Sequence, residues 1–110
     1  MKRYASHFLL LPEYGYLKQH VIVMEEEHIF SISPLTEETE NTEWFPGVIA
    51  LLRYSEQSEE SDFFDKSDDT LSAVPQNIEE ELPFLIPYLF YPFDFTTMRP
   101  VAETRRRQLR

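Results

Sequence analysis

The sequence predicts a single, mainly β domain, built as a small β-sandwich or a partly open barrel of antiparallel hairpins with a short C-terminal helix. Short segments of β-branched and aromatic residues alternate with polar ones, and Pro and Gly separate these segments. The 110 residues suffice for one domain with one modest core. A hydrophobic content of 42% and an aromatic content of 15% are typical of packed chains rather than disordered ones.

Hairpins are expected over residues 1–54. Residues 2–11 are apolar and aromatic with little helical period, and a turn follows at Pro12 to Gly15. Residues 16–24 and 28–33 alternate in part and predict two further strands. The three glutamates between them are too few and too polar for an element of their own, so they predict an acidic turn.

A polar stretch after Pro34 leads to Trp44 and to a Pro-Gly turn at Pro46 and Gly47. The unbroken apolar run over residues 48–52 favours a strand that is buried on both faces, although a short buried helix has the same pattern. Trp44 is more often a core or lid residue than a ligand-stacking one, because so large a ring favours burial.

Residues 55–81 are predicted to form an acidic, mobile linker, because acids and serines dominate their first part. Phe63 and Phe64 within it are expected to pack back on the domain, or else to form a short recognition element. Residues 82–110 are expected to close the domain. Prolines at 83, 87 and 92 exclude a helix there and favour extended edge strands, and residues 101–110 predict a short basic helix.

An aromatic segment on exposed strands promotes aggregation unless something covers it. Residues 84–95 are therefore expected to lie on the core or against a second subunit, as in a homodimer. The residues expected to contact a partner protein are Phe84, Tyr88, Phe90, Tyr91, Phe93, Arg105, Arg106 and Arg107.

The net charge of −10 is unevenly distributed. Residues 25–81 hold 17 acids and two bases, a balance of −15, whereas the two ends hold eight bases and three acids, a balance of +5. This acidity disfavours nucleic acid as a partner. The arginines of residues 105–110 are interpreted as a solvated helix end that complements the acidic middle, with an anion-binding adaptor as the alternative.

The chain has no cysteine, which excludes disulfides and thiolate zinc sites, and it has no apolar run of membrane-spanning length. Residues 8–11 are too short for the apolar part of a signal peptide. We expect a soluble, cytoplasmic protein with no membrane contact and no cofactor.

No residue stands out as catalytic or metal-binding. His7, His20 and His28 lie on consecutive predicted strands, which makes a three-histidine site conceivable, but no two of them have a ligand spacing on one strand. The glutamate clusters lie in polar runs, where water keeps carboxylates in their ordinary state. The sequence predicts neither a catalytic residue nor a metal site.

One order of elements in the first half of the chain is more specific. The order begins with a strand at residues 8–11, a glycine turn at Gly15 and a second strand at residues 21–24. It continues with an acidic turn at residues 25–27, a third strand at residues 29–32 and a Pro-Gly turn at Pro46 and Gly47. This order resembles the N-terminal composite β-domain of metallo-dependent hydrolases of the amidohydrolase superfamily, without the catalytic barrel. The resemblance implies that strands from the far end of the chain, here residues 84–95, complete the domain.

The chain departs from that family where the chemistry lies. Ala50 stands where the family has Asp or Asn, Leu52 and Tyr54 stand where it has two metal-binding histidines, and the rest of the chain is too short for a barrel of about 250 residues. The resulting hypothesis is a non-catalytic β-domain that acts through protein contacts or self-association. The alternative is a hydrolase-like enzyme or subunit whose metal site is completed by a partner chain.

Overall fold

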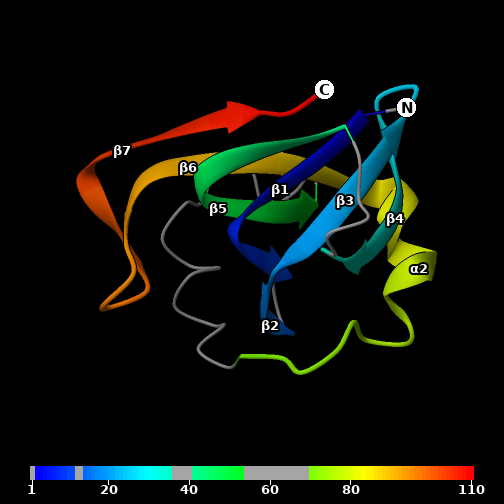
Figure 1. Ribbon diagram of the computed structural model, residues 1–110, viewed down its shortest axis with the longest axis horizontal. Coiled ribbons are helices and arrows are strands. Elements are labelled where there is room, and N and C mark those ends of the chain that lie inside the picture. The colour runs from blue at the N-terminus through cyan, green and yellow to red at the C-terminus, as the bar shows by residue number, and fades with distance from the viewer. Residues whose placement is uncertain (1, 12–13, 36–40, 54–69) are drawn as a thin grey trace.

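The computed structural model describes residues 2–11, 14–35, 41–53 and 70–110. These residues form one seven-stranded sheet that does not close, which confirms the mainly β class (Figure 1). The strands are β1 (Lys2–Leu11), β2 (Gly15–Lys18), β3 (His20–Glu25), β4 (His28–Pro34), β5 (Thr42–Arg53), β6 (Leu85–Asp94) and β7 (Arg99–Gln108). A one-turn helix, α2 (Ile78–Glu81), continues into a 3-10 turn, η2 (Leu82–Phe84).

The strand order is β4-β3-β1-β5-β6-β7, with β2 beside the second half of β1. The chain turns back after β1, and β2 and β3 pair with it in one register, from Leu11 opposite Gly15 to Lys2 opposite Met24. The predicted N-terminal hairpins are therefore present. β1 and β5, however, run parallel at the centre of the sheet, whereas the sequence predicted antiparallel hairpins throughout.

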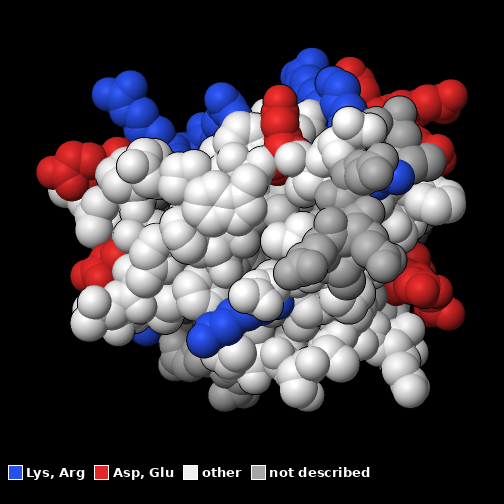
Figure 2. Space-filling view, viewed as in Figure 1, with Lys and Arg blue, Asp and Glu red and all other residues white. Residues whose placement is uncertain are grey.

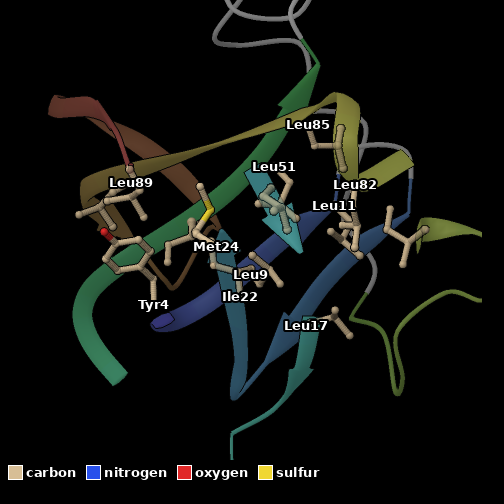
Figure 3. Close-up of a cluster of buried hydrophobic side chains, with 14 residues drawn as sticks. Tyr4, Leu9, Leu11, Leu17, Ile22, Met24, Leu51, Leu82, Leu85 and Leu89 are labelled. Carbon is tan, nitrogen blue, oxygen red and sulfur yellow. The ribbon is translucent and has the colours of Figure 1, made fainter. Parts of the chain in front are cut away.

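The sheet curls around a first core cluster, because β4, at one end of the strand order, comes back against η2 and β6. Figure 3 shows side chains from β1, β3, β5 and β6 converging inside this curl. Ile78 and Leu82 add to it from α2 and η2, since residues four apart lie on the same side of a helical turn. Its buried members are Tyr4, Leu9, Leu11, Leu17, Ile22, Met24, Ile29, Ile49, Leu51, Ile78, Leu82, Leu85, Leu89 and Leu109.

A second core cluster contains Leu10, Tyr16, Val48, Ala50, Leu52, Tyr88, Phe90 and Phe93. Successive side chains of a strand point to opposite faces, so β5 supplies alternate residues to the two clusters. Every residue from Val48 to Leu52 is at most 1% exposed. The prediction that this run is a strand buried on both faces is confirmed.

The prediction of a helix over residues 101–110 is wrong, because most of these residues belong to strand β7. In β7, Gln108 lies opposite Tyr88 and Arg105 lies opposite Tyr91. The helix propensity of these residues is weak evidence, because a segment this short is not stable as an isolated helix. Pairing with β6 satisfies the backbone hydrogen bonds of the segment instead. Within the described ranges the short α-helix is α2, earlier in the chain.

The predicted linker also differs from expectation in its last part. Thr70 bridges to Tyr16, the Leu71 N–H donates to the Tyr16 carbonyl at 2.7 Å, and Ile78 is 2% exposed. Residues 70–81 therefore pack against the sheet, because they carry apolar side chains for the first cluster. The acidic residues 55–69, including Phe63 and Phe64, lie outside the described residues. Neither helix in the described part of the chain has the length and apolar character needed to cross a membrane.

Candidate functional site

Three of the aromatic residues predicted to contact a partner belong to the core instead. Tyr88 is 8% exposed, Phe90 is 2% exposed and Phe93 is 8% exposed, and all three lie in the second cluster. The prediction is wrong for them because all three rings are buried on one face of β6: Tyr88 and Phe90 share that face by alternation, and the register shift between Tyr91 and Phe93 brings Phe93 to it.

Phe84 and Tyr91 are 72% and 52% exposed, so both are accessible to a partner. They lie far apart, since seven residues of extended chain span about 23 Å. Phe84 belongs to η2, whereas Tyr91 lies opposite Arg105 of β7. The aromatic segment therefore forms no continuous contact surface.

The three arginines lie on β7, with their side chains on alternating faces of the sheet. The Arg107 guanidinium lies 5.0 Å from the ring centre of Phe45. The Arg106 guanidinium lies 5.2 Å from the ring centre of Tyr88. Cation–π contacts of this kind orient a guanidinium. These arginines border a sheet edge and are not the solvated helix end that the sequence suggested.

The three histidines are separated by the register of the strands. His20 lies opposite Pro34 and His28 lies opposite Glu25, at the two ends of the β3–β4 pair. His7 lies on β1, against β5. Within residues 2–11, 14–35, 41–53 and 70–110, no three His, Asp or Glu side chains are grouped so that they could hold a metal ion.

The two described positions at which the resemblance would place family site residues lie in the core. Ala50 and Leu52 are each 0% exposed, in the second cluster. Tyr54 lies outside the described residues. Leu52 therefore packs as an ordinary core side chain where the resembled family has a metal ligand.

An exposed aromatic group that the sequence did not predict lies on β1, β5 and the β6–β7 connection. We call His7, Trp44 and Phe95 the Trp44 surface. The His7 ring centre lies 4.7 Å from that of Trp44, in an edge-on arrangement, and 4.7 Å from that of Phe95. Trp44 is nevertheless 50% exposed and Phe95 is 38% exposed.

A bulge between β1 and β5 builds this surface. The register between the two strands shifts after Ser6, so that Phe8 pairs with Val48. Gly47 occupies the bulge at φ +115°, and a β-carbon there would lie 2.4 Å from the Phe90 carbonyl oxygen. Only glycine fits such a position without strain. The Pro-Gly turn predicted from the sequence is thus a kink within one long strand.

The backbone also fixes the His7 ring. The Gly47 N–H donates to Nδ1 of His7 at 3.1 Å, so the neutral imidazole carries its proton on Nε2. Phe95 is held in turn by Phe8 and Phe93, at ring-centre distances of 5.6 Å and 5.7 Å. These contacts place His7 beside both Trp44 and Phe95, while the Trp44 and Phe95 rings remain partly exposed to solvent.

A separate hollow lies at the β3–β4 turn beside η2. It has a volume of about 580 Å³ and is lined by Glu25, Glu26, His28, Ile29, Phe30 and Pro83. Its lining mixes two acidic side chains with apolar ones.

No family model matches the chain, and no curated protein or solved structure is significantly similar to it. Its function is therefore inferred from its own residues.

Proposed function

We propose that this protein is a non-catalytic β-domain that acts through protein contacts, and that it self-associates by pairing the Trp44 surface with the same surface of a second copy. The observation that carries the proposal is the exposure of Trp44, Phe95 and His7. The His7 ring packs against each of the other two rings, and all three remain exposed to solvent.

The physical properties of the surface suit an interface. Tryptophan and other aromatic residues are enriched in the energetically dominant parts of protein interfaces. Rings that are already held in place lose little conformational entropy on binding. The anchors of this surface are in place before a partner arrives.

A second copy suits this surface because aromatic rings complement one another in edge-to-face pairs. A two-fold dimer places the same residues on both sides of its interface, and the Trp44 and Phe95 rings, which carry no charge, meet there without repulsion. Three rings cover less than the roughly 800 Å² per partner of a standard interface. The dimer is accordingly expected to be weak and to depend on concentration.

The resemblance to the composite β-domain stays a hypothesis with one supporting feature. Strands β6 and β7, from the end of the chain, extend the sheet that β1 to β5 begin, as that resemblance implies. The buried positions of Ala50 and Leu52 favour a domain without catalysis over a metal site completed by a partner.

Sedimentation equilibrium over a series of micromolar concentrations tests self-association. The mass of the wild-type protein should rise from 13.2 kDa toward twice that value, and Trp44→Ala should remain monomeric. Phe84→Ala is the matched control, because it removes an exposed aromatic side chain that lies elsewhere, and it should dimerise like the wild type.

Fluorescence gives a second readout, since Trp44 is the only tryptophan. Its emission should shift to shorter wavelengths over the same concentration range, because the indole leaves water. A wild-type protein that stays monomeric throughout, or a Trp44→Ala variant that dimerises normally, would refute the proposal.

A further inference from the structure

One of the three rings of the Trp44 surface can change its charge. Histidine is the side chain whose charge ordinarily changes between about pH 5 and pH 8, whereas indole and phenyl rings stay uncharged. His7 is exposed, so solvent reaches its imidazole. The ring that contacts both Trp44 and Phe95 is therefore the one that can take up a proton.

The hydrogen bond of His7 distinguishes the two charge states of its ring. Nδ1 accepts the Gly47 N–H at 3.1 Å, and Gly47 is buried in the bulge of β5. A protonated imidazole donates from both of its nitrogens and cannot accept at Nδ1. Protonation therefore breaks this bond and deprives the buried Gly47 N–H of its acceptor, which is costly.

The fixed charges near His7 are held away from its ring. Glu43 precedes Trp44 on β5 but lies opposite Tyr4 in the register, on the other face of the strand. The carboxylate of Asp94, which precedes Phe95, accepts two backbone N–H groups of its own turn at 2.8 Å and 3.3 Å. Arg99 pairs with that residue in the sheet and stays positively charged at every pH.

The turn between β2 and β3 lies opposite His7 in the strand register and carries Lys18 and His20. The Lys18 ammonium lies 5.6 Å from the ring centre of Phe8. Nδ1 of His20 lies 2.7 Å from the Lys18 carbonyl oxygen, so this ring is bound within its own turn. Ammonium and carboxylate groups ordinarily keep their charge above about pH 5.5. Of the groups around the Trp44 surface, the imidazoles of His7 and His20 are thus the ones that titrate between pH 5.5 and neutrality.

From this geometry we infer that His7 makes the self-association of the Trp44 surface depend on pH, because the neutral imidazole permits pairing and the protonated one opposes it. This inference rests on the proposed self-association and adds its regulation. A two-fold dimer includes His7 of both copies in one interface, so protonation brings like charges together there. Like charges across an interface are unfavourable, and the lost Gly47 hydrogen bond loosens the surface as well.

The attraction of a protonated His7 for the Trp44 ring does not reverse this direction. A cation beside an indole ring is stabilised by the electrons of the ring. The two rings are already in contact within one copy, so this stabilisation is present in the monomer and does not favour the dimer. Self-association should be complete above the pH range in which histidine titrates and should be lost as the pH falls through it.

The overall charge of the chain predicts the opposite trend. Its net charge is −10 and its pI is about 4.6, so acidification to pH 5.5 brings the protein closer to neutrality. Figure 2 shows acidic side chains at several separate places on one face, so this change affects the whole molecule. A smaller net charge weakens repulsion between copies and promotes association. A dimer that weakens on acidification therefore reports a specific group.

Sedimentation equilibrium at about pH 8 and about pH 5.5 tests the inference, since histidine changes its charge between these values. The wild-type dimer should be at least about tenfold weaker at the lower pH, a loss of about 1.4 kcal/mol. His7→Asn keeps an acceptor oxygen close to the backbone but cannot be protonated, and its association should be equal at the two pH values. His20→Asn and His28→Asn each remove another imidazole and should retain the pH dependence of the wild type.

A second measurement reads the hydrogen bond in the monomer. In Trp44→Ala, which the proposed function makes monomeric, the NMR resonance of the Gly47 amide should shift as the pH falls from about 8 to about 5.5, because its acceptor is lost. Adding His7→Asn to that variant should abolish the shift.

Three results would overturn the inference. They are a wild-type dimer of equal strength at both pH values, a His7→Asn dimer that weakens in acid like the wild type, and a Gly47 resonance that does not move. A wild-type protein that is monomeric even at pH 8 would instead remove the self-association and its regulation together, so the two failures can be told apart.

Discussion

Ser6 is the single buried polar residue among the described residues. Its side chain forms hydrogen bonds with backbone groups at the bulge between β1 and β5. Its Oγ donates to the Phe8 carbonyl at 2.6 Å and accepts from the Ile49 N–H at 3.3 Å. The register shift after Ser6 interrupts the ladder that would otherwise satisfy these backbone groups. The hydroxyl replaces the missing pairing.

We therefore expect Ser6→Ala to lower the free energy of unfolding by about 1–3 kcal/mol, the cost of leaving a buried backbone donor without a partner. Urea denaturation measures the change. Ser33→Ala, on the exposed part of β4, is the control and should stay within about 0.5 kcal/mol of the wild type. Equal effects from the two substitutions would contradict this role of Ser6.

At the scale of single elements, the β3–β4 turn carries an avoidable strain. Glu25 pairs with His28, which leaves a two-residue turn of Glu26 and Glu27, with φ values of 51° and 70°. Such turns favour Asn-Gly, because both central residues need positive φ. The two glutamates form this turn, but their positive φ values lower the stability of the folded state.

Glu27→Gly should thus raise the free energy of unfolding by about 1 kcal/mol, since glycine accepts positive φ without steric penalty. Thermal or urea unfolding measures this. Glu25→Gly, one position before the turn and within β3, should instead destabilise by about 0.5–1 kcal/mol. A destabilised Glu27→Gly variant would show that the turn is not strained.

Helix α2 is attached to the sheet through Glu81. The Tyr14 hydroxyl donates to Oε2 of Glu81 at 2.6 Å, and Arg53 pairs with Oε1. The Tyr14 hydrogen bond, assisted by Arg53, lowers the pKa of Glu81 below its ordinary value of 4.5. The ionised carboxylate therefore holds three separate parts of the chain together.

A lowered pKa in the folded state means that the contribution of Glu81 to stability is present above pH 4.5 and is lost as the pH falls through the folded-state pKa. Glu81→Gln should be less stable than the wild type at neutral pH, and the difference should shrink in acid. Denaturation at a series of pH values measures this. Glu79→Gln, on the exposed side of α2, should follow the wild type at every pH, and a parallel curve for Glu81→Gln would disprove the linkage.

At the scale of the whole molecule, the last residues of the chain pack against the first. Leu109 is 4% exposed in the first core cluster. The Arg110 carbonyl accepts a hydrogen bond from the Tyr4 hydroxyl at 2.5 Å and from Lys2 Nζ at 2.8 Å. These contacts join the end of β7 to the beginning of β1, far from β7 in the strand order.

Leu109→Ala should accordingly cost about 2–5 kcal/mol, as expected for a buried leucine truncated to alanine. Chemical denaturation measures the loss. Val101→Ala, on β7 and 37% exposed, is the control and should change stability little. If both variants unfold like the wild type, Leu109 is not part of the core.

The sequence predicted most of the fold but little of the candidate site, for an identifiable reason. Hairpins and the buried run over residues 48–52 follow from local alternation and turn chemistry, which a sequence displays directly. The exposure of Trp44 depends on which side of β5 it occupies beyond the Pro46 and Gly47 bulge. A bulge changes the face of the sheet to which the following side chains point. The local sequence does not show where the register with the partner strand shifts.

By itself, the sequence determined a mainly β domain, its first hairpins, the central buried strand and the concentration of positive charge at the end of the chain, because these depend on neighbouring residues. Only the tertiary structure decided that β1 and β5 run parallel, that the arginines lie on the last strand of the sheet order, and that Phe90 is buried while Trp44 is exposed. Each of these depends on which distant strands pair and in which register. A shift of one residue in that register reverses the face that every side chain occupies.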